Sequence, residues 1–148
     1  SMSKGYSLAG LRFGYLIGHA GLIKPMPEKT RDSYNVDALA QVLAEAALTD
    51  VDYARHNWQT IKASREDLRE QLIALGFNVP RSQTNFVLAQ CANEHAATAL
   101  QLYDGLRKRD IFVRYFKDLP ERLRISVGSD GENAALLQAL AELLGGEA

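Results

Sequence analysis

The chain has 148 residues, of which 47% are hydrophobic and 24% are charged, and its formal net charge is −1. This length favours about one domain with one ordinary buried core. The charges are mixed in sign, which argues against a nucleic-acid or anionic membrane surface and favours small molecules or other protein chains as partners. No apolar stretch reaches the roughly 20 residues of a membrane helix, and the start lacks a signal-peptide pattern, so we expect a soluble, cytoplasmic chain.

Cysteine and histidine usage argues against disulfide and metal chemistry. Cys91 is the only cysteine, which excludes an internal disulfide and a thiolate metal cluster. We interpret Cys91 as a small apolar residue near a strand end rather than as a nucleophile. His19, His56 and His95 fall on different predicted elements and form no ligand pair, so no metal site is expected.

The first third of the chain predicts a strand, a linker and a helix. Residues 11–17, Leu-Arg-Phe-Gly-Tyr-Leu-Ile, include closely spaced β-formers and predict a mostly buried strand. Gly21, Pro25 and Pro27 then mark a polar stretch that we interpret as a linker or domain crossing. A helix with apolar residues at helical spacing is expected over residues 39–49.

A second, longer helix follows. Its apolar positions repeat in alternating steps of four and three, broken only by Arg65. Asp50 can cap its start and Gly76 its end. At about 1.5 Å per residue, a helix of about 25 residues reaches nearly 40 Å, which is long enough to bridge two domains. Trp58 belongs to the apolar stripe, and we interpret it as a packing residue.

Three short strands are predicted in the last part of the chain, over residues 85–89, 111–116 and 123–127. In the third strand, apolar residues alternate with Arg124, which therefore points away from the apolar face. Arg124 can then meet either a ligand or solvent. Without further information, an exposed strand arginine is more often a solvated charge.

Two helices alternate with these strands. Ser129 and Glu132 form a capping box at the start of the last helix. Asn93 is expected to cap the other helix, whose predicted apolar face comprises Ala96, Ala99, Leu100, Tyr103 and Leu106. From about residue 51 onward, this order of elements predicts a compact α/β sandwich, with helices packed on a small sheet.

A lysine near the start of the chain is the main candidate for chemistry. Lys4 follows Ser3 on a small-residue loop, and Arg12 comes eight positions later at the head of the predicted strand. An amine that condenses with an aldehyde must be partly unprotonated, and a neighbouring guanidinium favours this while it binds a phosphate through paired N–H groups. Spacing alone nevertheless favours two surface charges over a cofactor site.

The segment around Lys4 resembles that of a known enzyme family. Ser-Lys, followed by Leu-Ala-Gly-Leu-Arg and Gly-Tyr, is similar almost letter for letter to the lysine segment of histidinol-phosphate aminotransferases, which are fold-type I pyridoxal-phosphate (PLP) enzymes. The resemblance implies that Lys4 carries the cofactor and moves a proton between substrate carbon atoms. It also implies that Ser3 and Arg12 bind the cofactor phosphate.

The resemblance continues along the whole chain in the family's order. Residues 33–41 resemble the family's Pro-Tyr-Asn-Val segment, with Ser33 in place of the usual proline. Residues 84–88, 113–116 and 123–128 resemble the three strands of the family's small domain. The chain is therefore expected to have the α/β fold of that domain.

Two arginines match positions that bind substrate in the family. Arg124 matches the arginine that binds the substrate carboxylate, and Arg114 matches one that helps to bind the substrate's anionic end. A further family arginine in the last helix has no counterpart, because residues 133–137 are uncharged. This difference from the family weakens the assignment of the substrate more than that of the cofactor.

The resemblance implies the C-terminal part of such an enzyme. Residues 1–34 would be a remnant of the PLP-binding large domain, residues 35–50 a connecting helix, and residues 51–148 the small domain with its long bridging helix. The opening Ser1-Met2 resembles the scar of tag removal, so we expect an excised piece. Family enzymes hold the PLP ring with upstream residues, so PLP is expected in the full-length homodimer and not in this piece, which we expect to be inactive alone.

The implied reaction moves an amino group between glutamate and imidazole-acetol phosphate, in histidine biosynthesis. One alternative is a sister enzyme on the same fold, either a threonine-phosphate decarboxylase or an aromatic-amino-acid aminotransferase. Another is a non-catalytic α/β interaction module in which Lys4 is incidental. Substrate profiling of the full-length protein separates the enzymes, and the sequence upstream of Ser3 decides between an enzyme and a module.

Overall fold

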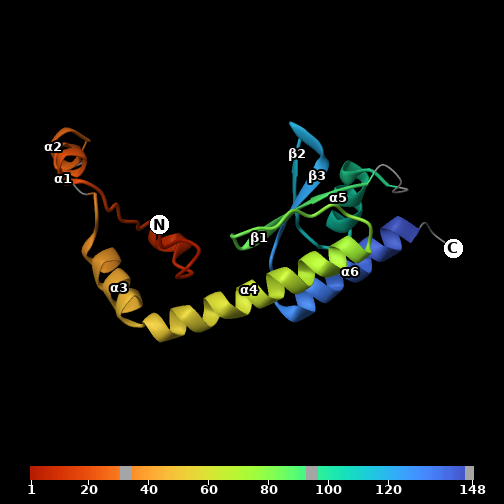
Figure 1. Cartoon of the computed structure of the whole chain (residues 1–148), viewed down its shortest axis with the longest axis horizontal. Helices are drawn as coiled ribbons and strands as arrows, with labels where there is room; N and C mark the ends of the chain where they lie inside the picture. Colours follow the sequence, from red (N-terminus) through yellow and green to blue (C-terminus); the bar gives the residue numbers. More distant parts are fainter. Residues whose placement is uncertain (31–34, 93–96, 146–148) are drawn as a thin grey trace. The chain divides into compact units, whose positions relative to one another are not determined.

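The computed structural model describes residues 1–30, 35–92 and 97–145 (Figure 1). These residues form two compact units, Ser1–Trp58 and Gln59–Ala148. The long helix α4 (Val51–Ala74) contributes residues to both units. The fold is α/β, as the sequence predicts. The predicted domain boundaries after residues 34 and 50 stay a prediction.

The first unit is made of short helices joined by loops. It contains the 3-10 turn η1 (Ala9–Leu11), the helices α1 (Ala20–Ile23), α2 (Pro25–Thr30) and α3 (Ala38–Thr49), and the start of α4. Helix α3 begins where the side chain of Asp37 accepts a hydrogen bond from the Ala40 amide at 2.7 Å. This cap stabilises the first turn, and the predicted helix is confirmed.

The predicted strand over residues 11–17 is wrong. The chain turns through η1 and continues without regular structure up to α1. Tyr15, Leu16 and Ile17 are 55%, 64% and 86% exposed. A strand needs a hydrogen-bonded neighbour, and no other segment of the described residues pairs with this stretch as a strand. Because β-propensity depends on such a neighbour, β-forming side chains do not make a strand here.

The predicted linker contains two short helices instead, α1 and α2. The Nδ1 atom of His19 caps α1, because it accepts a hydrogen bond from the Gly21 amide at 3.2 Å. Pro25 and Pro27 lie in the first turn of α2. The backbone N–H groups of a first turn have no partner within the helix, so proline costs no hydrogen bond there.

Helix α4 spans 24 residues and confirms the long helix that the sequence predicts. Asp50 caps its start, because the carboxylate accepts a hydrogen bond from the Tyr53 amide at 3.3 Å. The helix ends at Ala74, and Gly76 follows with a φ of 88°. Glycine takes this left-handed conformation without steric cost, so Gly76 ends the helix as predicted.

The second unit holds a three-stranded antiparallel sheet with the strand order β1-β3-β2. Its strands are β1 (Phe86–Gln90), β2 (Arg114–Phe116) and β3 (Leu119–Ser126). The three predicted strands are therefore present, although β2 is shorter than predicted and β3 begins earlier. Because β3 lies in the centre, its register fixes both neighbours.

One face of this sheet packs against helices to form the core. Buried leucines of α4, α5 (Ala99–Arg107) and α6 (Asp130–Gly145) lie against alternate side chains of β1 and β3. Burial of one such side chain contributes about 1.5–3 kcal/mol, so this contact holds the unit together. The core side chains include Val87, Ala89, Leu123, Ile125, Leu68, Leu72, Leu102, Leu106, Leu136 and Leu140.

Helix α5 begins later than predicted. Thr98 and Gln101 form a capping box at its start, in which the Thr98 amide donates to Oε1 of Gln101 at 2.8 Å. Thr98 therefore caps this helix where the prediction placed Asn93. Asn93 itself and Ala96 lie outside the described residues.

Helix α6 begins at the predicted capping box. The amide and the hydroxyl of Ser129 both donate to the Glu132 carboxylate at 2.7 Å. These hydrogen bonds lower the pKa of Glu132, and they confirm the predicted capping box of α6.

The apolar face of α5 differs from the prediction at one position. Leu100 is 46% exposed, so its predicted place on the apolar face is wrong. Leu102 is buried in its place, whereas the prediction that Ala99 and Leu106 face the core is confirmed.

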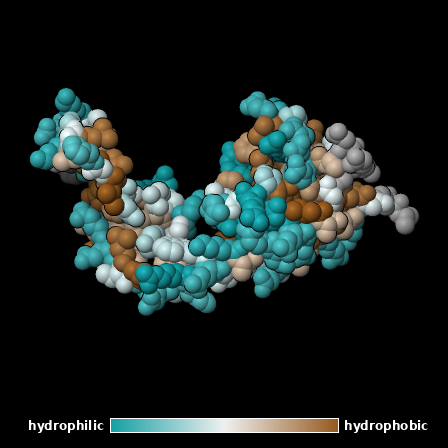
Figure 2. All heavy atoms as spheres, in the orientation of Figure 1, coloured by the Kyte–Doolittle hydropathy of each residue, from teal (hydrophilic) through white to brown (hydrophobic). Residues whose placement is uncertain are grey.

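Apolar side chains remain on the surface of the first unit, where Figure 2 shows brown patches. In α3 the buried residues are alanines, whereas Leu39, Val42 and Leu43 are 66%, 64% and 41% exposed. Exposed apolar surface of this kind is typical of contact with further protein. None of the described helices is both long and apolar enough to cross a membrane.

We expect Gly76→Ala to lower the free energy of unfolding of the second unit by about 1 kcal/mol, because alanine has to adopt a left-handed backbone conformation there. Gly131→Ala is the matched control, since an added Cβ at Gly131 meets nothing within 4 Å. Urea unfolding followed by circular dichroism measures both variants. A stability of Gly76→Ala equal to that of the unmodified chain would contradict the prediction.

Candidate functional site

Lys4 lies in a tight loop at the start of the first unit. The Ser7 amide donates to the Lys4 carbonyl, and the Leu8 amide donates to the Met2 carbonyl, both at 3.2 Å. Met2 is fully buried, and its own amide donates to the Phe13 carbonyl at 3.2 Å. The loop is therefore anchored by Met2, while Lys4 is exposed.

Ser3 and Arg12 lie on neighbouring stretches of backbone, because each is next to a member of the hydrogen-bonded pair Met2 and Phe13. Arg12 has a φ of 56°, which is left-handed and uncommon for a residue other than glycine. Such a conformation costs about 1–2 kcal/mol and is enriched at functional sites. The Arg12 guanidinium donates to the Ala9 carbonyl at 3.1 Å and makes no other hydrogen bond within the described residues.

Trp58 holds the Lys4 loop, a role that helical spacing does not reveal. Its indole Nε1 donates to the Gly5 carbonyl, and its ring packs edge-on against Tyr6 with the centroids 5.6 Å apart. A Cβ at Gly5 would lie 3.4 Å from Nε1 of Trp58, so the two segments are in close contact. A partly buried tryptophan needs an acceptor for its N–H group, and this requirement is the one feature of the sequence that could have pointed to the role of Trp58.

The second group of candidate residues lies on the sheet face opposite the core. Arg114 of β2 and Arg124 of β3 are directly opposite each other in the strand register. Residues paired in this way point to the same face of the sheet. Leu123 and Ile125, on either side of Arg124, are buried, so Arg124 points away from the core as the alternation predicts.

Two phenylalanine rings lie next to these guanidinium groups. Arg124 Cζ is 5.0 Å from the ring centroid of Phe86 and 5.8 Å from that of Phe116. Arg114 Cζ is 5.1 Å from the centroid of Phe116. Each cation–π contact of this kind contributes about 0.5–1 kcal/mol at an exposed site. Phe116 therefore stabilises two like charges at once.

Arg114 and Arg124 have no acidic partner within the part of the chain that the structure describes, whereas Arg65, Arg109 and Arg122 each have one. Two like charges opposite each other on a sheet destabilise it. A bound anion relieves this repulsion, and a guanidinium binds a carboxylate or phosphate through two parallel N–H···O bonds. The arrangement is therefore suited to binding an anionic ligand.

Asn133 lies in the stretch where the resemblance leads one to expect a further arginine. It is buried, its Oδ1 accepts from the Gly128 amide at 3.0 Å, and its Nδ2 donates to the Gly128 carbonyl at 3.2 Å. Asn133 thus fixes the connection from β3 into α6, which is a structural role.

Cys91 does not add a reactive site. Its side chain is buried, and burial raises the pKa of its thiol to about 11. The thiol is therefore protonated at neutral pH, which agrees with its interpretation as a small apolar residue. In residues 1–30, 35–92 and 97–145, no three His, Cys, Asp or Glu side chains gather in a way that could hold a metal ion.

The five predicted site residues form two groups, one in each unit. Ser3, Lys4 and Arg12 belong to the first unit, and Arg114 and Arg124 belong to the second. The first group offers an amine, a hydroxyl and a guanidinium, and the second offers two guanidinium groups on one sheet face.

Comparison with known proteins identifies the family. The family model described as aminotransferase class I and II matches residues 1–140. The chain belongs to the class I and II aminotransferase family. Histidinol-phosphate aminotransferase 1 from Nostoc sp. is 47% identical over 146 residues, which cover 97% of this chain and 40% of that protein. The histidinol-phosphate aminotransferase from Microcystis aeruginosa is 44% identical over 147 residues, covering 98% of this chain and 41% of its own length.

Solved aminotransferase structures share the fold. The histidinol-phosphate aminotransferase from Sinorhizobium meliloti, solved in complex with pyridoxal-5'-phosphate, has a TM-score of 0.84 at 31% identity, covering 97% of this chain and 40% of that one. The enzyme from Clostridium acetobutylicum has a TM-score of 0.83 at 27% identity, covering 95% and 43%. This class I and II aminotransferase chain thus spans 40% and 41% of the two curated relatives.

We expect Trp58→Phe to loosen the Lys4 loop, because phenylalanine keeps an aromatic ring but cannot donate to the Gly5 carbonyl. Loss of one hydrogen bond should speed the exchange of the Ser7 and Leu8 amides about fivefold. Tyr53→Phe, a change of an exposed aromatic residue on the same helix, is the control. Hydrogen exchange measured by NMR tests this, and unchanged rates in Trp58→Phe would refute the anchoring role.

Proposed function

We propose that the intact protein that contains this chain is a PLP-dependent aminotransferase of histidine biosynthesis. It exchanges an amino group between glutamate and imidazole-acetol phosphate, which yields 2-oxoglutarate and histidinol phosphate. The observation that supports this best is the closed loop around Lys4, with Ser3 and Arg12 on neighbouring backbone. The curated relatives, which are histidinol-phosphate aminotransferases, favour this reaction over those of sister enzymes.

The side chains of the first unit fit an aldehyde that carries a phosphate. Lys4 supplies an exposed primary amine, Ser3 a hydroxyl and Arg12 a guanidinium with N–H groups to spare. Ser3 and Arg12 would hold the phosphate through charge-assisted hydrogen bonds. When it is bound, PLP supplies an electron sink that stabilises negative charge at the substrate Cα atom.

Lys4 would act as the acid and base of the reaction. Its Nζ atom would accept the proton that leaves the substrate Cα atom and would then donate it to the carbon atom that forms the aldehyde group of the free cofactor. This role requires an unprotonated amine.

Arg114 and Arg124 would bind the substrate. Arg124 would hold the α-carboxylate of the substrate, and Arg114 would help to hold the anionic end of the substrate. Glutamate has two carboxylates, and imidazole-acetol phosphate has a phosphate. Two guanidinium groups side by side on one face suit such anionic substrates, because each can form paired N–H···O bonds.

The activity would belong to the intact protein. The chain spans 40% of the length of its relative from Nostoc sp., and the resemblance implies that the residues that hold the cofactor ring lie upstream. We therefore infer that the chain alone has negligible turnover. By the same resemblance, the intact protein would be a cytoplasmic homodimer that contains PLP.

In the intact protein, we expect Lys4→Ala to abolish the visible absorbance of lysine-bound PLP and to slow the half-reaction with glutamate about a thousandfold, because the amine that binds the cofactor and moves the proton is lost. Lys24→Ala, at another lysine of the same unit, should change neither. Absorbance spectra and single-turnover rates measure both effects. Persistence of the cofactor absorbance in Lys4→Ala would overturn the proposed function.

We expect Arg124→Gln to raise the KM for glutamate by about 10- to 100-fold, the cost of losing a charged hydrogen-bonding partner. Arg122→Gln is the matched control, because Arg122 lies on the same strand and is paired with Glu121 at 3.1 Å. Steady-state kinetics of the intact protein measure both values. Similar KM values for the two variants would show that Arg124 does not bind the substrate.

A further inference from the structure

We propose that Arg65 is a positioning residue for substrate binding, which fixes the place of the Arg124 guanidinium on the sheet by acting through Thr84 and Phe86. The inference rests on the proposed function, because Arg124 is the residue that would bind the substrate carboxylate. All four residues belong to the second unit.

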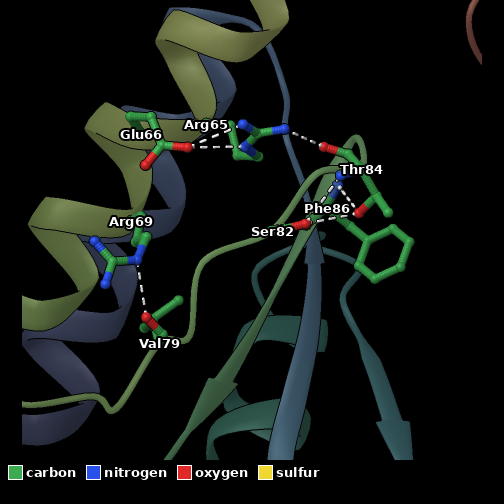
Figure 3. Close-up of polar contacts among 7 residues, drawn as sticks. All are labelled: Arg65, Glu66, Arg69, Val79, Ser82, Thr84 and Phe86. Atoms are coloured by element: carbon green, nitrogen blue, oxygen red, sulfur yellow. Dashed lines mark hydrogen bonds and ion pairs between the residues drawn. The ribbon is translucent and has the colours of Figure 1, made fainter.

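Arg65 is an arginine at a buried position of helix α4. It is 6% exposed, although arginine is seldom buried. Its Nε and Nη2 atoms donate to Glu66 at 3.1 and 2.9 Å, and its Nη1 atom donates to the Thr84 carbonyl at 3.0 Å (Figure 3). Burial of a charge is costly, and a leucine would continue the apolar stripe without any partner. Compared with a leucine, Arg65 adds polar contacts with Glu66 and Thr84, and the contact with Thr84 is the one that links α4 to a segment outside the helix.

The Thr84 carbonyl belongs to the turn that leads into β1. Within this turn, the Thr84 hydroxyl accepts a hydrogen bond from the Phe86 amide at 3.3 Å and donates to the Phe86 carbonyl at 3.1 Å. The Ser82 hydroxyl accepts from the Thr84 amide at 3.1 Å (Figure 3). Thr84 thus holds Phe86 at its backbone, and Arg65 ties Thr84 to helix α4.

Phe86 connects this turn to Arg124. It is the first residue of β1 and lies opposite Ser126, on the sheet face that also carries Arg124. The Phe86 ring centroid lies 5.0 Å from Arg124 Cζ. A cation–π contact depends on where the cation lies over the ring. If the turn shifts, the ring moves and the preferred place of the guanidinium moves with it.

Arg69 offers a comparison one helical turn away. Its Nε atom donates to the Val79 carbonyl at 2.9 Å, so Arg69 also ties α4 to the segment before β1 (Figure 3). Val79 precedes Phe86 by seven residues and makes no side-chain hydrogen bond to the turn within the described residues. Arg69 thus shares the residue type, the helix and the kind of bond with Arg65 but lacks the connection to Arg124.

The first experiment measures the place of the Arg124 guanidinium in this chain. Ring currents of the two adjacent phenylalanines shift the NMR signal of the Arg124 Nε–Hε group, so this signal reports their geometry. We expect Arg65→Gln to move the signal toward that of a free arginine, and Arg69→Gln to leave it in place. Arg65→Lys, which keeps a charged donor for the Thr84 carbonyl, should restore part of the shift.

The second experiment measures carboxylate binding by the intact protein. The probe is glutarate, a dicarboxylate with the carbon chain of glutamate and no amine. We expect Arg65→Gln to raise the dissociation constant about fivefold, the size of one lost cation–π contact, and Arg69→Gln to leave it unchanged. Thr84→Val, which keeps the side-chain shape but removes the hydroxyl, should weaken binding in the same direction and serves where Arg65→Gln does not fold.

Arg124→Gln separates this inference from the proposed function. If Arg124→Gln weakens glutarate binding while Arg65→Gln and Thr84→Val do not, the positioning role is overturned and the proposed function stands. If Arg124→Gln has no effect on glutarate binding, the substrate-binding role of Arg124 and the positioning role of Arg65 are both overturned, and the test of the aminotransferase function remains Lys4→Ala. A lower melting temperature of Arg65→Gln, with the Arg124 signal and glutarate binding both unchanged, indicates a purely structural role and also overturns the proposal.

Discussion

Arg114 and Arg124 lie opposite each other on adjacent antiparallel strands, and this pairing of like charges is the main constraint on the sheet face of the second unit that lies away from the core. Two guanidinium groups in this position repel each other. The rings of Phe86 and Phe116 offset part of the repulsion, and a bound anion would offset more. Because the helices cover the other face of the sheet with the apolar core, this face can carry charge without burying it.

The first unit depends on a different constraint, the closure of the loop that carries Lys4. Buried Met2 anchors this loop from within, and the Trp58 indole binds it at Gly5. Arg12 adopts a left-handed backbone conformation at the end of the loop. It precedes Phe13, whose carbonyl accepts a hydrogen bond from the Met2 amide. A residue in a sparsely populated backbone conformation at this end of the loop agrees with the proposed role in ligand binding.

The two units therefore contribute different chemistry to the proposed enzyme. The first unit offers an amine and phosphate-binding groups, and the second offers groups that bind carboxylates. Buried Arg65 shows how the second unit combines packing with function, because one side chain both fills a helix position and ties the turn before β1. The exposed apolar side chains of α3 agree with a chain that spans less than half the length of its curated relatives.

Local sequence determined the elements whose signals are local. Asp37, Asp50, Gly76 and the Ser129–Glu132 capping box set helix ends through contacts within a few residues, and the alternation around Arg124 set its direction. The Lys4 motif likewise indicates the family through a short run of adjacent residues. Only the tertiary structure decided what depends on distant partners: residues 11–17 lack a strand neighbour, Trp58 donates to a loop more than fifty residues away, and Arg65 binds a carbonyl on another segment. Hydrogen bonds between distant segments leave no periodic pattern in the sequence, which is why spacing alone identified Trp58 as packing and Arg65 as an interruption.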